Sequence, residues 1–290
     1  MKDLFSKRWF RIVIGLVAFI AMYSMARYQR RTGPTWPVPV EEVLAGSEVS
    51  GELIRTQPGD EDARVAVTVT SADTQGEVVW RRYPTQEEWN RLAMVREESD
   101  GTSELAAYLP NQPPAAKLEY SVRLWQDSGE LTVPNGSTAV IRFRGEVPAW
   151  VLIPHVIVMF LTLWIVFRAA IGAVLGEMAV RRFIPSILGF LIFGGFFLGP
   201  LVQKYAFDDW WTGWPFGTDW TDNKTLAALI AWLLAWWLCR KWPQFQRGAV
   251  IFATVVMIVV YLIPHSMGGS EMDWESMEIE TGRAPAALTQ

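Results

Sequence analysis

The sequence predicts a membrane-embedded α-helical bundle of five spans joined to an extracytoplasmic all-β sandwich domain. Of the 290 residues, 51% are hydrophobic and only 19% are charged. That balance is too apolar for an ordinary soluble domain and too charged for a chain that lies wholly in lipid. The charges are also unevenly placed, since acidic and basic residues mix through 41–147 and nearly vanish from four later apolar runs.

The overall charge and the cysteine content exclude several function classes. A net charge of −4 without a basic stripe argues against nucleic acid as a partner. The single cysteine, Cys239, excludes an intrachain disulfide and a cysteine-rich metal site.

Residues 1–33 have the pattern of an N-terminal signal-anchor helix. Basic residues, Arg8 and Arg11 among them, precede the apolar run 12–26. We expect this helix to remain uncleaved, because bulky Tyr23 and the arginines that begin at Arg27 make a poor processing site. The following residues, 34–44, contain three closely spaced prolines and are expected to form an extended linker.

Residues 45–147 are predicted to form the sandwich. Alternation of apolar and polar side chains indicates strands with one buried and one solvated face, as in antiparallel sheets. The segments with this pattern are 64–70, 117–125 and 138–144, with shorter candidates at 76–80 and 104–109. A capping-box pattern from Thr85 to Glu88 predicts one short helix between them, leading into Leu92 and Met94.

The run LPNQPPAAKLEY, residues 109–120, resembles the turn before a late strand in Ig-like and fibronectin type III modules. The resemblance covers only residues 45–147 and implies the general sandwich, because no cysteine pair is present for an antibody-type bridge. Such modules bind partners or act as spacers, and we expect one of these roles here.

Residues 148–270 are predicted to form a four-span membrane bundle. The apolar runs are 150–167, 183–201, 225–239 and 249–264. The last two are short for a span, which needs ~17–25 residues, unless flanking turns extend them. Asp222 or Thr221 as an N-cap would begin the third run earlier, and Pro264 would leave carbonyls free at the end of the fourth.

Basic residues favour one orientation of this bundle. Segments 168–182 and 240–247 hold six Lys and Arg residues together, whereas 203–224 holds two. Basic loops remain in the cytoplasm, so the N-terminus is expected inside, and the sandwich and the C-terminal tail, 271–290, outside. The expected location is the inner membrane of a cell.

Two features of the bundle are expected to shape its interior and its outer mouth. Gly195 and Gly199 form a GxxxG pattern, which we interpret as close packing inside the bundle in preference to a dimer seam. The outer loop 203–225 is rich in Trp and Asp, and exposing all of its rings would create a large apolar patch. We therefore expect it to fold over the bundle mouth as a lid.

The two histidines are the best candidates for a site. His155 and His265 both end a Leu-Ile-Pro-His segment, and antiparallel spans would bring both to the outer level. Two imidazoles with one or two carboxylates suit a transition metal ion, and two facing imidazoles alone suit haem b. The candidate carboxylates at that level are Asp208, Asp219, Asp222 and Glu271. The alternative is that each imidazole only bonds a backbone carbonyl near the interface.

Three functions follow, in order of preference. The first is an integral inner-membrane subunit or scaffold whose outside sandwich binds a partner protein. The second is a membrane metalloprotein with its site at the outer face of the bundle. The third is a transporter, which is disfavoured because the cores of the spans contain no Asp, Glu, Lys, Arg or His apart from His155.

Overall fold

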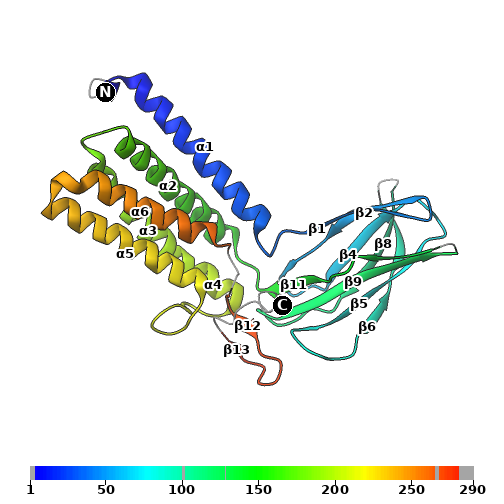
Figure 1. Ribbon diagram of the computed structural model, residues 1–290. Coiled ribbons are helices and arrows are strands. Elements are labelled where there is room, and N and C mark those ends of the chain that lie inside the picture. Colours follow the sequence, from blue (N-terminus) through cyan, green and yellow to red (C-terminus); the bar gives the residue numbers. More distant parts are fainter. Residues whose placement is uncertain (1–3, 100–101, 128, 265–267, 281–290) are drawn as a thin grey trace. The chain divides into compact units, whose positions relative to one another are not determined.

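The computed structural model describes residues 4–99, 102–127, 129–264 and 268–280. The chain divides into two compact units. One comprises Met1–Gly33 and Val147–Gly269, and the other comprises Pro34–Glu146 and Ser270–Gln290. Figure 1 shows that the first unit is helical and that the second is built from strands.

The helical unit contains long helices joined by short turns. Its α-helices are α1 (Arg8–Thr32), α2 (Ala149–Val174), α3 (Ile184–Leu191), α4 (Gly199–Phe207), α5 (Trp220–Lys241) and α6 (Gln246–Leu262). Shorter helical turns of other types are η2 (Val180–Phe183), the π-helix η3 (Ile192–Leu198) and η4 (Pro243–Phe245). Segments η2 to α4 follow one another without a break and form one continuous helical rod.

Within the described residues, four helical segments are long and apolar enough to cross a membrane, a feature that suggests a membrane protein. They are Arg8–Thr32, Ala149–Val174, Val180–Phe207 and Pro243–Leu262. The remaining expected span, residues 225–239, corresponds to α5, which is not among the four. Its first turns carry Asp222 and Lys224, and its tryptophans add less hydropathy than aliphatic residues would.

The bundle core is close-packed around small residues, as the GxxxG pattern predicts. A Cβ atom on Gly194 would lie 2.9 Å from side-chain atoms of Met159 and Val158 in α2. A Cβ atom on Gly195 would lie 2.7 Å from Thr225 of α5. Because two helices contact the π-helix η3 this closely, larger residues there would push the helices apart. The expected close packing is therefore found at Gly195, whereas a Cβ atom on Gly199 would make only ordinary contacts, 3.8 Å from His155 Cε1.

A buried carboxylate organises the end of the bundle where α2 finishes. Glu177 accepts from Arg168 Nη1 at 2.8 Å and from Arg182 Nη2 at 2.5 Å, and its side chain is only 4% exposed. From α6, Arg247 Nε donates to Ala173 O at 2.7 Å, which satisfies a carbonyl of the last turn of α2. Three of the six basic residues that were expected on one side therefore lie at one end of the bundle.

The strands of the second unit form two mostly antiparallel sheets. The first has the order β1 (Val38–Leu44), β2 (Ser47–Leu53), β4 (Ala63–Val69), β8 (Thr102–Leu109), β7 (Val95–Ser99). The second has the order β3 (Thr56–Pro58), β11 (Ala139–Arg144), β9 (Lys117–Gln126), β5 (Gln75–Tyr83), β6 (Asn90–Ala93), with β10 (Gly129–Val133) also paired to β9. Only β3 and β11 pair in parallel among the described strands.

A single apolar core joins the two sheets. Val65 and Leu105 from the first sheet and Leu118 and Ile141 from the second belong to one buried cluster. Along β4, buried residues alternate with more exposed ones, as the sequence pattern predicts. Tyr120 is fully buried in this core, and its hydroxyl donates to the Ile54 carbonyl at 2.7 Å. Two sheets that share one core in this way form a β-sandwich.

The expected strands are confirmed, and the expected helix is wrong. Each of the five alternating segments coincides with a strand, namely β4, β5, β8, β9 or β11. Residues 85–89 are irregular, and β6 follows where the helix was expected. Leu92 pairs with Val78 of β5, so sheet pairing outweighs the local capping signal. The strand β1 begins at Val38, inside the stretch that was expected to be a linker.

The segment after Gly269 returns to the sandwich. Lys117 forms a buried ion pair with Glu271, and Arg142 Nη2 donates to the Ser270 carbonyl. The backbone N–H of Met272 donates to Ala115 O at 3.3 Å. A short hairpin, β12 (Glu271–Met272) and β13 (Ile279–Glu280), completes the described chain. The region expected as a free outer tail thus begins as part of the sandwich unit.

The ion pair also changes the chemistry of the buried lysine. Burial lowers the pKa of Lys117, and the Glu271 carboxylate counteracts that shift. A buried cation left without its carboxylate would be costly, so Lys117 holds the C-terminal segment in place.

Candidate functional site

The Trp-rich loop, residues 208–219, connects α4 to α5 and is held to the first turn of α5 by several hydrogen bonds. The helix α4 ends at Asp208, which adopts a left-handed conformation with φ 63°. Asp219 begins α5 as its N-cap, with Oδ1 accepting from Thr221 N at 2.6 Å. The cap is therefore Asp219 and neither Asp222 nor Thr221, although the earlier start of the helix is as expected.

Asp222 fastens the loop to the first turn of α5. Its Oδ2 accepts from the backbone N–H groups of Thr212 at 2.7 Å and Gly213 at 3.1 Å. The Gln203 amide, oriented so that its oxygen accepts from Thr212 Oγ1, donates to both Asp222 oxygens at 3.1 and 3.2 Å. A Cβ atom on Gly213 would come within 2.6 Å of Asp222 Cβ, so a glycine is required for this approach. The buried carboxylate is thus fully occupied by the loop that it holds.

Lys224 connects the same turn of α5 to the end of α6. Its Nζ donates to Ile263 O at 2.9 Å and to Pro264 O at 3.1 Å, and the residue is 8% exposed. These are carbonyls just beyond the last turn of α6, where Pro264 cannot continue the helix. A cation at a helix C-terminus is also favoured by the helix dipole. The carbonyls expected to be free near Pro264 are therefore bound by Lys224.

The aromatic rings of the Trp-rich loop divide into a packed ring and exposed rings. Trp211 stacks on Phe196 of η3, with ring centroids 5.3 Å apart. Trp210, Trp214 and Phe216 are exposed, Phe216 by 83%. Only part of the loop therefore packs on the bundle, whereas a lid would bury most of its rings. The exposed rings are of the kind that lie at membrane–water interfaces.

His155 lies beside the π-helix. Its Nδ1 is 3.0 Å from Gly194 O, and Gly199 N donates to the same carbonyl across the wide turn of η3. Because a carbonyl only accepts, Nδ1 carries the proton in this contact, and Nε2 is left with its lone pair. His155 thus bonds a backbone carbonyl, as in the alternative without a metal. Its other ring nitrogen remains able to bind a ligand.

The other predicted site residues lie in different settings. His265 lies outside the described residues, so its pairing with His155 stays a prediction. Asp219 and Asp222 lie together in the first turn of α5, whereas Asp208 is 85% exposed and pairs with Lys204 at 2.6 Å. Glu271 belongs to the sandwich unit, where Lys117 holds it. Among the described residues, no three His, Cys, Asp or Glu side chains gather in a group that could hold a metal ion.

Sequence reasoning did not identify Gln203 and Lys224 as members of the network around Asp222. The signal for Lys224 was available, because it is a lone cation directly before an apolar run, where a buried charge needs partners. Nothing local marks Gln203, since its role depends on the loop folding back ten residues later.

No protein-family model matches the chain, and no curated protein is significantly similar to it.

Replacing Asp222 by Ala should release the Trp-rich loop. The change removes the acceptor for two buried N–H groups, each costing about 1–3 kcal/mol when unpaired. Limited proteolysis of the purified protein should then cut within 208–219 at least tenfold faster than in the unchanged protein, a factor equal to about 1.4 kcal/mol.

The matched control is Asp208→Ala, which removes a carboxylate of the same loop that makes only a surface ion pair. It should leave the cutting rate nearly unchanged, because such pairs contribute about 0–1 kcal/mol. Equal rates for the two variants would contradict the role given to Asp222.

Proposed function

We propose that the chain is a five-span scaffold of an inner membrane, which holds its β-sandwich outside the cell's cytoplasm to bind a partner protein. The supporting observation is that the segment beginning at Ser270 is bonded into the sandwich. In the chain, the main part of the sandwich lies between α1 and α2.

This connectivity limits the number of membrane crossings. Glu146 and Ser270 both belong to the sandwich unit, so the chain between them has to leave and re-enter on the same side of the membrane. An even number of crossings is needed. Three of the four apolar helical segments lie in this interval, and a fourth crossing is required. The helix α5 supplies it, and together with α1 it brings the total to five.

The length and the polar ends of α5 are compatible with a span. Its 22 residues extend about 33 Å at 1.5 Å per residue, against a hydrocarbon core of about 30 Å. Its charged residues lie at its ends, with Arg240 and Lys241 in the last turn. Both side chains also lie over tryptophan rings, which is common at a membrane interface.

The orientation follows from the distribution of basic residues. Arg168, Arg182 and Arg247 lie at one end of the bundle through their contacts near the end of α2. The end of α5 that carries Arg240 precedes α6 on that same side. Since basic loops stay in the cytoplasm, this end faces inward and the sandwich faces outward.

The outward face of the first sheet is the surface that we propose for the partner. Val95 in β7 and Tyr108 in β8 are exposed apolar side chains, 67% and 49% respectively. Beside them, Arg64 binds Glu97 and Glu104 at 2.7 Å each. An edge strand next to exposed aromatic and paired charged groups suits a protein partner that adds a strand or packs on the sheet.

The five-span topology predicts which positions a membrane-impermeant thiol reagent reaches. With Cys239 replaced by Ala, cysteines at Gly217 and Glu275 should be labelled from outside. A cysteine at Gln244 should react only after the membrane is opened. Labelling of Gln244 from outside, or protection of Gly217, would show that α5 does not cross.

The partner surface predicts a specific cross-link in living cells. A photoreactive amino acid at Val95 should give one dominant cross-linked protein. The same group at Val43, an exposed position at the opposite edge of the first sheet, should not. Equal products from both positions, or none from Val95, would count against this surface.

A second function, a membrane metalloprotein, is favoured by one observation. His155 donates through Nδ1 to a carbonyl, the arrangement that orients a histidine to bind metal or haem through Nε2. Under this proposal His265 and a carboxylate would complete the site.

Metal analysis and an absorption spectrum of the purified protein test this second function. A transition metal or haem should be present in about one equivalent and be lost in His155→Ala. Thr162→Ala, at another buried polar side chain of α2, should keep it. Protein that carries neither metal nor haem would eliminate this function and leave the scaffold.

A further inference from the structure

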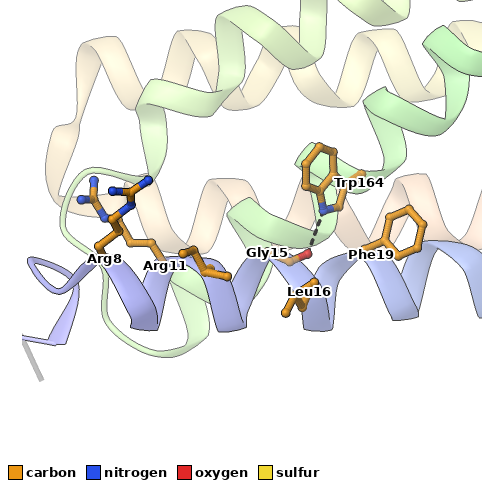
Figure 2. A pocket seen from close by; sticks show the side chains of 7 residues that line it. Arg8, Arg11, Gly15, Leu16, Phe19 and Trp164 are labelled. Atoms are coloured by element: carbon orange, nitrogen blue, oxygen red, sulfur yellow. Dashed lines mark hydrogen bonds between the residues drawn. The ribbon is translucent and has the colours of Figure 1, made fainter.

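A groove lies between α1 and α2 at the surface of the helical unit. It measures about 720 Å³ and is lined by Ile12, Gly15, Leu16, Phe19 and Trp164, with Arg8 and Arg11 at one end. Figure 2 shows the two arginine side chains close together at that end, with Trp164 and Phe19 at the other.

The contacts between the two helices show why the groove stays open. Trp164 Nε1 donates to Gly15 O at 2.8 Å, and Phe19 meets the Trp164 ring edge-on with centroids 6.5 Å apart. Gly15 itself has no side chain, and nothing lies within 4 Å of the place a Cβ atom would take. The helices therefore meet at Trp164 and leave an unfilled apolar channel toward the start of α1.

The apolar lining remains uncovered by the chain itself. Ile12, Leu16 and Phe19 are each about half exposed. In a membrane-spanning helix, such a surface faces hydrocarbon, so its natural occupant is lipid or another helix. A groove of about 720 Å³ has the volume of a small-molecule site, which suits the acyl part of a lipid.

The two arginines determine which lipid fits. No described carboxylate forms an ion pair with Arg8 or Arg11, and both side chains are exposed. From Arg8 to Phe19 the helix rises about 16 Å, close to the half-thickness of a hydrocarbon core of about 30 Å. Guanidinium groups bind phosphate through paired hydrogen bonds. A cationic end and an apolar channel as deep as one leaflet match the two parts of a phospholipid.

We propose that this groove is a binding site for an anionic phospholipid of the leaflet at the N-terminal end of α1. Arg8 and Arg11 bind the headgroup phosphates, and one acyl chain lies along Gly15 toward Trp164. The lipid fills the contact between α1 and α2 that the protein leaves open.

Native mass spectrometry of the full-length protein in neutral detergent tests this site. After removal of bound lipid, phosphatidylglycerol should be retained as one equivalent, and phosphatidylcholine with the same acyl chains should not. The double substitution Arg8→Gln, Arg11→Gln should weaken retention of phosphatidylglycerol about thirtyfold, equal to about 2 kcal/mol. The control Arg27→Gln, Arg31→Gln makes the same charge change at the other end of α1 and should have little effect.

A second pair of variants tests the acyl channel without changing charge. Gly15→Leu fills the groove and should abolish stoichiometric retention. Gly189→Leu adds the same side chain at another glycine with open space around it and should not. If both arginine pairs weaken binding equally, or if Gly15→Leu has no effect, the lipid is held only by diffuse surface charge and the proposed site is wrong.

Discussion

The bonds that join Ser270 and Glu271 to the sandwich are the constraint on which the proposed membrane topology depends. Lys117 in β9 lies 154 residues before Glu271, and Arg142 in β11 lies 128 residues before Ser270, yet both bind this segment directly. A β-sheet can accept a late segment only on its own side of the bilayer. Under the proposed topology, the chain between them leaves and re-enters the membrane on the same side, and the assignment of α5 as a span rests on this requirement more than on its composition.

Several polar side chains near the ends of the helices share one role. They bind backbone groups that have no partner within a helix or a sheet. Asp222 binds loop N–H groups, Lys224 binds the carbonyls beyond α6, and Arg247 binds those that end α2. His155 binds the carbonyl that the π-helix exposes. Ionisable residues in such places are usually read as signs of chemistry. Here the four named above are accounted for by the backbone, and in its neutral form His155 also keeps a nitrogen with a lone pair.

The parts of the fold that could be predicted from sequence are those that depend on local periodicity. Alternation of apolar and polar residues predicted β4 and β9, because each strand has one buried face. The length of an apolar run predicted α2. The strand β1 was missed because Pro39 and the two prolines just before the strand are typical of a linker. The strand β6 was predicted as a helix because a capping signal depends only on neighbouring residues and carries no information about the partner strand. The candidate site was predicted only in part. The partners of Asp222 depend on how the Trp-rich loop folds back on α5, and the spacing of residues in the sequence does not reveal this.

The sandwich segment that begins at Ser270 is also made much later than the rest of the sandwich during synthesis. About 120 residues, including most of the membrane bundle, separate Glu146 from Ser270. At ~5–20 residues per second, the ribosome takes about 6–25 s to make them. Throughout that time Lys117 is without the carboxylate it pairs with in the finished protein. The ion pair therefore forms only after every helix of the bundle has been made. Under the proposed topology, a chain with one helix on the wrong side of the membrane would leave Lys117 without its carboxylate.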